Sequence, residues 1–175
     1  MSASPRERAQ VAETVLPLMP PAVRRILERQ PAEVVASLEE IRLRTGRPLV
    51  LGCAGGEVRV RADGSPAVDP CEGYLVTAED VEAALALISR SSLYALEEEI
   101  RLGFVTVAGG HRVGLAGKVL LEGGRVRTIR PVTSLAFRVS REIRGAADGV
   151  LPLILSGGWP ESTLVVSPPQ GGKTT

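Results

Sequence analysis

Hydrophobic residues recur at helical spacing over the first forty residues of the chain. Val11, Val15 and Leu18 fall on one face of the helix that "SPRERAQVAETVLPLM" predicts, and a Pro-Pro pair ends it. The stretch "AVRRILERQ" predicts a second short helix, and residues 31–38 predict a third. We therefore expect a helical N-terminal subdomain over residues 1–38.

The period changes to two in the next segment. In "EEIRLRTGRPLVLG", Ile41 and Leu43 alternate with Arg42 and Arg44, which predicts a half-buried strand, a turn and a second strand. The stretch "EVRVRADG" repeats the alternation, and a loop rich in Gly, Pro and Asp follows over residues 63–73. This part of the chain therefore begins a sheet.

Helical spacing returns in "TAEDVEAALALISRSSLYALEEEIRLG". Thr77 and Asp80 match a capping box, and Gly103 is a plausible stop after two helical faces. From Phe104 the segments "FVTVAGG", "HRVGLAGKVLLEGG", "RVRTIRPV" and "SLAFRVS" predict an antiparallel meander with Gly-rich turns. A short helix in "GAADGVLPLIL" and a buried-type strand in "STLVVS" follow.

The order of these elements predicts an α+β fold. We expect an antiparallel or mixed sheet covered by two helices on one face, with the helical cap before it. Residues 39–145 would form this α+β domain. Residues 146–175 would hold a linker helix, a strand and a terminal loop.

Composition narrows the functional classes. The hydrophobic fraction is 44% and the charged fraction 23%, which is ordinary for a globular protein. The net charge of +1 gives no global field toward DNA or an acidic membrane, although it leaves room for a local basic patch. Two cysteines and one histidine do not complete a zinc site. We find no secretory signal and no apolar run of about 18 residues that would predict a membrane span.

The stretch "LVVSPPQGGKTT" carries the chemistry of a phosphate-binding loop. It fits the pattern G-x-x-x-x-G-K-[ST], except that Ser167 stands where the first glycine belongs. The predicted nucleotide-binding residues are Pro169, Gln170, Gly171, Gly172, Lys173, Thr174 and Thr175. The ammonium of Lys173 would reach the β and γ phosphates, and the hydroxyl of Thr174 would bind Mg²⁺. The alternative is a polar tail in which "GGKTT" arises by chance.

The elements that would complete an ATPase are not in this sequence. A Walker-B acid and a water-positioning residue should follow the loop, after a helix that begins near Lys173. We therefore predict no catalytic residue in the chain and no ATP held by this chain alone. A self-sufficient nucleotide binder is the competing hypothesis.

Three stretches, "EIRLRTGRPLVL", "GFVTVAGGHRVGLAGKV" and "LVVSPPQGGKTT", resemble the stage III sporulation protein AA family of endospore-forming bacteria. The resemblance covers residues 39–175. It departs at Gly171, where we expect a cysteine in the family. The resemblance implies that the chain is the N-terminal part of a longer protein, and that it ends at the first strand and P-loop of a RecA-like ATPase domain.

This family is in turn similar to the ATPases of type II secretion and type IV pili. That similarity implies an N-terminal domain that packs over nucleotide, ATP and Mg²⁺ in the full-length protein, and a hexameric ring. The implied role is to energise a channel between mother cell and forespore. The protein would be cytoplasmic, on the mother-cell side of the septum, and peripheral to the membrane through channel membrane proteins.

Arginines that alternate with apolar residues form a second candidate site. They are Arg42, Arg44, Arg59, Arg61, Arg125 and Arg127, with Arg112 and Arg138 in later strands. A solvated sheet face with local ion pairs explains most of them. By resemblance to secretion ATPases, Arg112 and Arg138 are the choices for contact with nucleotide phosphates or a neighbouring subunit.

The alternative function is a nucleic-acid-binding module that uses this arginine-lined sheet. A related plastid and cyanobacterial group shares the "GGHRVG" style of segment and carries a nucleic-acid-binding domain further along its chain. Low net charge and an aromatic fraction of 3% argue against nucleic acid as a partner. His111 has no partner spaced for a catalytic triad, so we expect a hydrogen-bonded structural role. The glycines of "AGGHRVGLAG" predict bulges or close packing.

Overall fold

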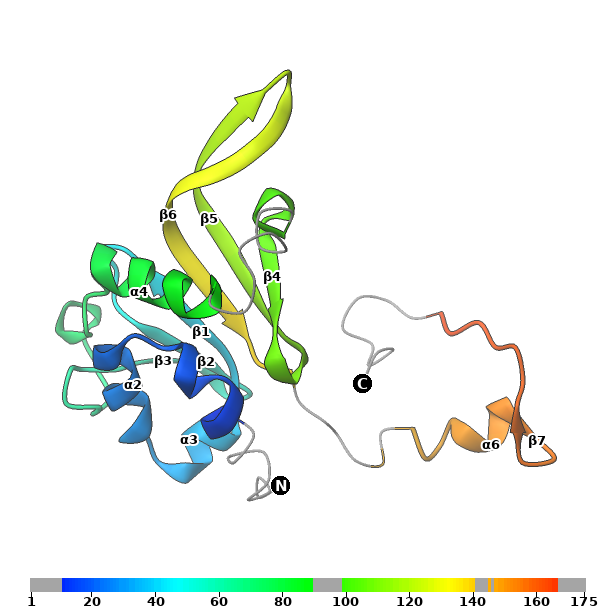
Figure 1. Cartoon of the computed structure of the whole chain (residues 1–175). Coiled ribbons are helices and arrows are strands. Elements are labelled where there is room, and N and C mark those ends of the chain that lie inside the picture. Colours follow the sequence, from blue (N-terminus) through cyan, green and yellow to red (C-terminus); the bar gives the residue numbers. More distant parts are fainter. Residues whose placement is uncertain (1–10, 90–98, 141–144, 146, 167–175) are drawn as a thin grey trace. The chain divides into compact units, whose positions relative to one another are not determined.

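The computed structural model describes residues 11–89, 99–140, 145 and 147–166. The chain divides into two compact units, Met1–Ser140 and Arg141–Thr175. The first unit contains the sheet and the helices that pack on it (Figure 1). The second contains a short helix, α6 (Leu151–Ile154), and a small hairpin formed by β7 (Leu155–Ser156) and β8 (Trp159–Pro160).

The first unit is built on a six-stranded antiparallel sheet in the order β3-β2-β1-β6-β5-β4. Its strands are β1 (Leu38–Arg44), β2 (Val50–Cys53), β3 (Gly56–Arg59), β4 (Phe104–Val107), β5 (His111–Glu122) and β6 (Arg125–Arg138). The sequence thus forms two three-stranded meanders. They join where β1 pairs with β6, with Ile41 opposite Phe137.

Helices cover one face of this sheet. They are a helical turn at residues 11–14, η1 (Leu16–Leu18), α2 (Pro21–Glu28), α3 (Ala32–Ala36) and α4 (Ala78–Ser89). The short turns η2 (Pro70–Glu72) and η3 (Ala108–Gly110) lie in connections, and residues 99–102 are helical before β4. The predicted α+β class, the helical N-terminal segment and the antiparallel sheet are confirmed.

The core forms where the helices meet the sheet. Ile41 and Leu43 of β1 point to it, as do Leu135 and Phe137 of β6, and all four are at most 1% exposed. Helix residues that share the cluster include Val15, Val23, Ile26, Val81 and Ala84. Alternation along each strand leaves the second face of the sheet to the charged positions between these residues.

Two predicted elements differ from the structure. The segments "RVRTIRPV" and "SLAFRVS" form one strand, β6, because irregular register with β5 near Gly117 absorbs the break between them. A Cβ on Gly117 would lie 2.2 Å from the Pro131 carbonyl oxygen, so this close approach needs glycine. The buried strand predicted in "STLVVS" is wrong for residues 162–166, and Ser167 lies outside the described residues. Leu164 is 87% exposed there, and no described strand pairs with it.

Candidate functional site: the open face of the sheet

The face of the sheet opposite the helices, which we call the open face, carries four of the eight predicted arginines. Its side chains come from alternate positions of the four strands β1, β4, β5 and β6. They are Glu40, Arg42, Arg44, Phe104, Thr106, Arg112, Gly114, Ser134, Ala136 and Arg138. The core residues of the same strands point to the other face. The open face therefore follows from the alternation of side chains along each strand.

The two arginines chosen from the sequence are brought together. Arg112 of β5 lies directly opposite Arg138 of β6, and Arg138 lies opposite Glu40 of β1. Directly opposed residues in an antiparallel pair have Cβ atoms about 5 Å apart. Like charges at that spacing are destabilising, so the pair concentrates positive charge that the fold itself does not require.

The surroundings compensate this charge weakly. The guanidinium carbon of Arg112 lies 5.2 Å from the centre of the Phe104 ring, a cation–π distance. Nε of Arg138 lies 3.8 Å from Oε1 of Glu40, and the Arg138 side chain is 77% exposed. An ion pair this long and this exposed contributes little.

Glu40 is engaged more closely by another arginine. Nε and Nη2 of Arg42 each lie 2.5 Å from Glu40 Oε2, and Arg42 also pairs with Glu57. Hydrogen bonds to Glu40, then to Glu57, raise the pKa of Arg42 above its ordinary value. Arg61 likewise pairs with Glu72. For Arg42 and Arg61 the local ion pairs predicted from the sequence are confirmed, which reduces the charge available to a nucleic acid.

Small residues cover the part of the open face beside the arginine pair. Gly114 lies opposite Phe104 on one side and Ala136 on the other, and Ala116 lies opposite Ser134. A Cβ on Gly114 would meet Ala136 only at 3.9 Å, an ordinary contact. This part of the open face therefore has only small side chains and leaves space beside the two arginines.

His111 holds the end of the open face in place. The residue is 1% exposed, and its Nδ1 accepts a hydrogen bond from the Ser140 backbone N–H at 2.8 Å. Its Nε2 therefore carries the proton and donates to Thr14 Oγ1 at 2.7 Å. Burial lowers the pKa of this imidazole. The predicted structural role is confirmed. His111 directly precedes Arg112, and its partner Ser140 is two residues beyond Arg138.

Gly109 permits this arrangement. Its φ of +83° suits glycine, and a Cβ there would lie 2.7 Å from His111 Nε2 and 3.3 Å from Thr14 Cβ. The prediction that glycines of "AGGHRVGLAG" mark close packing holds at this position and at Gly117.

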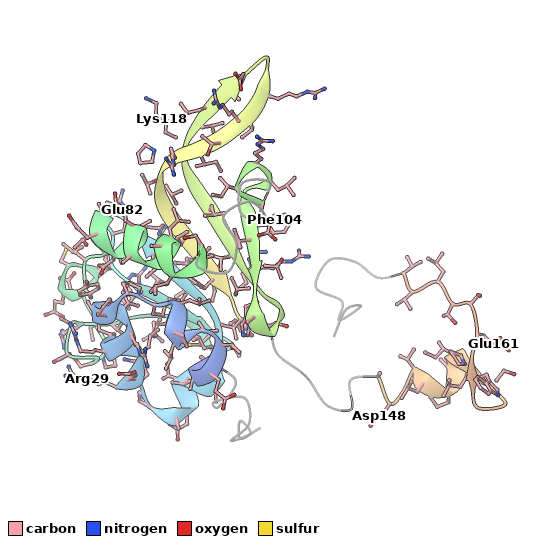
Figure 2. All side chains as sticks on the ribbon, viewed as in Figure 1. Arg29, Glu82, Phe104, Lys118, Asp148 and Glu161 are labelled. Carbon is pink, nitrogen blue, oxygen red and sulfur yellow. The ribbon has the colours of Figure 1, made fainter. Side chains whose placement is uncertain are left out.

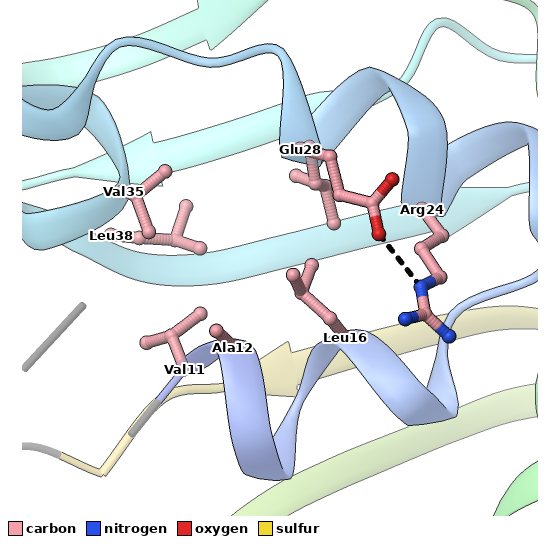
Figure 3. Close-up of a pocket in the computed structure, with 8 residues that line it drawn as sticks. Val11, Ala12, Leu16, Arg24, Glu28, Val35 and Leu38 are labelled. Atoms are coloured by element: carbon pink, nitrogen blue, oxygen red, sulfur yellow. Dashed lines mark hydrogen bonds and ion pairs between the residues drawn. The ribbon is translucent and has the colours of Figure 1, made fainter. Parts of the chain in front are cut away.

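A cavity of about 340 Å³ lies on the opposite side of the sheet (Figure 3). Its lining is mainly apolar and comes from Val11, Ala12, Leu16, Arg24, Leu27, Glu28, Val35 and Leu38. The charged members, Arg24 and Glu28, pair with each other at 2.9 Å at the rim. Among the residues that the structure describes, neither Arg112 nor Arg138 lines it.

The other predicted site residues cannot be placed. Pro169, Gln170, Gly171, Gly172, Lys173, Thr174 and Thr175 lie outside the described residues. Within the part of the chain that the structure describes, no group of three His, Cys, Asp or Glu side chains could hold a metal ion. Phe104 and Glu40 were missed as members of the site. Cross-strand register places both, and the sequence alone does not specify that register.

The fold and the site together define an α+β domain that carries an exposed arginine pair on an open sheet face. The chain belongs to the family described as "Sporulation stage III, protein AA", whose model matches residues 8–175. It is similar to the stage III sporulation protein AA of Bacillus subtilis (strain 168), with 37% identity over 158 residues. The resemblance noted from the sequence is confirmed.

That similarity covers 90% of this chain and 47% of the relative, so the chain spans about half the length of the curated relative it matches. No solved structure matches the chain. In the described residues, helices fall short of the length and apolar character that a membrane crossing requires.

Proposed function

We propose that the chain is the N-terminal part of a sporulation-associated, secretion-type ATPase, and that its open face contacts nucleotide phosphates or a neighbouring subunit. Membership of the family supports the role in sporulation. The residues matched by the family model include Gly171–Thr175, and Lys173 with them. In this proposal the domain resembles the N-terminal domains of type II and type IV secretion ATPases and covers the nucleotide.

The arginine pair is the observation that carries the proposal. Arg112 and Arg138 are directly opposed on neighbouring strands and poorly compensated, an arrangement that opposes stability. A local rule broken in this way is expected at functional sites. Two adjacent guanidinium forks fit an anion with several oxygens, such as a phosphate chain or the carboxylates of another subunit.

The phosphate loop would supply the rest of the nucleotide site. Backbone N–H groups of Gly171–Thr175 would converge on phosphate oxygens, while Gln170 and Pro169 shape the loop. Lys173 would neutralise the β and γ phosphates, and Thr174 would hold Mg²⁺ with ATP. We propose that ATP and Mg²⁺ bind the full-length protein, which forms a hexameric ring in the cytoplasm and docks on membrane proteins of the sporulation channel.

Substitution of the arginine pair in the full-length protein tests the proposal. Arg138→Ala and Arg112→Gln should each lower kcat/KM for ATP by about tenfold or more, because each removes a charge-assisted contact. Arg44→Gln is the matched control, since Arg44 lies on the same face but opposite Ser134. Unchanged ATP turnover and affinity in Arg138→Ala would sink the role of the open face.

Calorimetry on the 175-residue chain tests whether the loop binds nucleotide without the rest of the proposed site. We expect weak or absent binding of Mg-ATP, because the residues that complete the site are missing. Micromolar affinity that Lys173→Ala abolishes would instead establish a self-sufficient nucleotide binder, and the proposed division of the site would be wrong.

A further inference from the structure

The hairpin of β5 and β6 extends well beyond the sheet. We call residues 117–131 the arm (Figure 1). The last ladder pair between β4 and β5 is Phe104 with Gly114, and the ladder between β1 and β6 begins at Arg44 with Ser134. Beyond these points the two strands of the hairpin form ladder pairs only with each other. One contact from outside the hairpin reaches the arm, where Arg101 Nε donates to the Arg127 carbonyl oxygen at 3.1 Å.

Large apolar side chains are exposed on the arm near its tip. Leu121 is 65% exposed, Val119 47%, Leu120 43% and Val126 36%. The register places Leu121 opposite Val126 on one face, while Leu120 lies on the other face opposite Thr128. Ile129, opposite Val119, is 7% exposed and is not a member of the core cluster of described residues. A hairpin that only faces water would not carry this apolar surface on both sides.

Basic residues surround these apolar positions. The arm contains Lys118, Arg125, Arg127 and Arg130, and its one acid is Glu122. Figure 2 shows the Lys118 side chain on the hairpin, remote from the labelled Arg29 of the helical side. The arm thus has a net charge of +3 in a chain whose net charge is +1, so the rest of the chain sums to −2. Positive charge is concentrated where apolar surface is exposed.

Exposed apolar side chains together with basic neighbours favour one kind of binding partner for the arm. A nucleic acid would use the charge but leave the leucines unexplained, and the arm has no aromatic side chain on which a base could stack. A protein groove would cover one face of the hairpin. Apolar side chains on both faces of a projecting tip are best covered by a medium that surrounds the tip, and basic neighbours require that medium to be anionic at its surface.

We infer that the arm docks the protein on an anionic membrane surface. Leu120, Leu121 and Val126 would enter the boundary between headgroups and acyl chains, and Arg125 and Arg127 would contact lipid phosphates. The inference refines the membrane-peripheral place in the proposed function. It is independent of nucleotide chemistry, so either idea can fail while the other stands.

Co-sedimentation of the chain with vesicles tests the inference. We expect binding to vesicles of phosphatidylcholine with about 30% phosphatidylglycerol, little binding to pure phosphatidylcholine, and weaker binding at high salt. Arg125→Gln and Arg127→Gln should each weaken binding about fivefold. The pair Leu120→Ser and Leu121→Ser should weaken it about tenfold.

Matched controls lie outside the arm. Val68 is 93% exposed, so Val68→Ser removes a comparable apolar side chain, and Arg29→Gln removes an exposed charge. Neither should change vesicle binding, and circular dichroism should show all variants folded. The inference is overturned by equal binding to neutral vesicles, by no binding to anionic ones, or by arm variants that bind like the controls. Arm variants that alter self-association while vesicle binding is absent would identify a contact between copies instead.

Discussion

A single imidazole joins three distant parts of the chain at the residue scale. His111 links Thr14 in the N-terminal helical turn to Ser140 at the end of the first unit, through both ring nitrogens. Its Nδ1 accepts a hydrogen bond from a backbone N–H. A second proton on the ring would sit on Nδ1 and turn it into a donor, which would break this hydrogen bond. The neutral ring is therefore part of the folded structure, and the position of Arg112 depends on it through the chain.

This geometry predicts how stability depends on pH. Burial lowers the pKa of His111 below the ordinary 6.5, so the unfolded chain binds more protons than the folded chain between the two values. The free energy of unfolding should be greatest above pH 6.5 and fall as pH is lowered below it, by at most about 1.4 kcal/mol per unit. Urea unfolding at pH 7.5 and 5.5 measures this change.

The variant His111→Gln supplies the comparison for this measurement. The chain has one histidine, so no other imidazole titrates in this range. The variant should be less stable at pH 7.5, and its stability should change less between the two pH values. An equal loss of stability in both proteins would assign the pH dependence to other groups.

At the scale of elements, α4 is fixed by its first turn. The Thr77 backbone N–H donates to Asp80 Oδ2 at 3.0 Å, and the Asp80 N–H donates to Thr77 Oγ1 at 3.2 Å, a reciprocal capping box. The Tyr74 hydroxyl donates to the same Asp80 oxygen at 2.7 Å. Burial, and then this hydrogen bond, raise the pKa of Tyr74 to about 12, so the hydroxyl remains a donor.

Removal of the Asp80 carboxylate should destabilise the helix and the fold. Asp80 is 7% exposed, and Asp80→Ala leaves the Thr77 N–H and the Tyr74 hydroxyl without their acceptor. We expect a loss of about 2 kcal/mol in the free energy of unfolding, measured in urea. Glu82→Ala on the exposed side of α4 should change stability by no more than about 0.5 kcal/mol. Equal effects of the two substitutions would contradict the capping role.

Elements with local signals were predictable from the sequence. The capping pair Thr77 and Asp80, and the alternation around Ile41 and Leu43, depend on neighbours within a few residues, and both predictions are confirmed. The composition of the open face was not predictable. Phe104 joins Arg112, and Glu40 joins Arg138, only through pairing between strands that are distant in sequence. Periodicity gives each strand its two faces but not its partner or register.

At the scale of the whole molecule, the core belongs to one unit. The buried cluster extends from Val11 to Phe137, with Val139 packed against it, and all of these residues lie within Met1–Ser140. The described apolar residues of Arg141–Thr175 include Leu153 at 83% exposed and Trp159 at 78%. The stability of the first unit should therefore be largely independent of the second.

Truncation tests this independence. A chain that ends at Ser140 should unfold within a few degrees of the 175-residue chain in a thermal melt, since it keeps every described member of the core cluster. A chain that ends at Phe137 loses the Ser140–His111 hydrogen bond and the bond from the Val139 N–H to the Glu39 carbonyl oxygen. It should be less stable by about 2 kcal/mol. Equal melting of both truncated chains would show that the His111 contact contributes nothing.

The pairing of β1 with β6 at the centre of the sheet also has a consequence for synthesis on the ribosome. About ninety residues separate Arg44 from its partner Ser134, so the N-terminal meander emerges with β1 as an open edge. At roughly 5–20 residues per second, that edge waits on the order of ten seconds for β6. If a second copy approached this edge in parallel register, Glu40, Arg42 and Arg44 would each face the same charged residue of that copy, and the like charges would repel. The residues that later support the open face would thus first protect the nascent chain from aggregation.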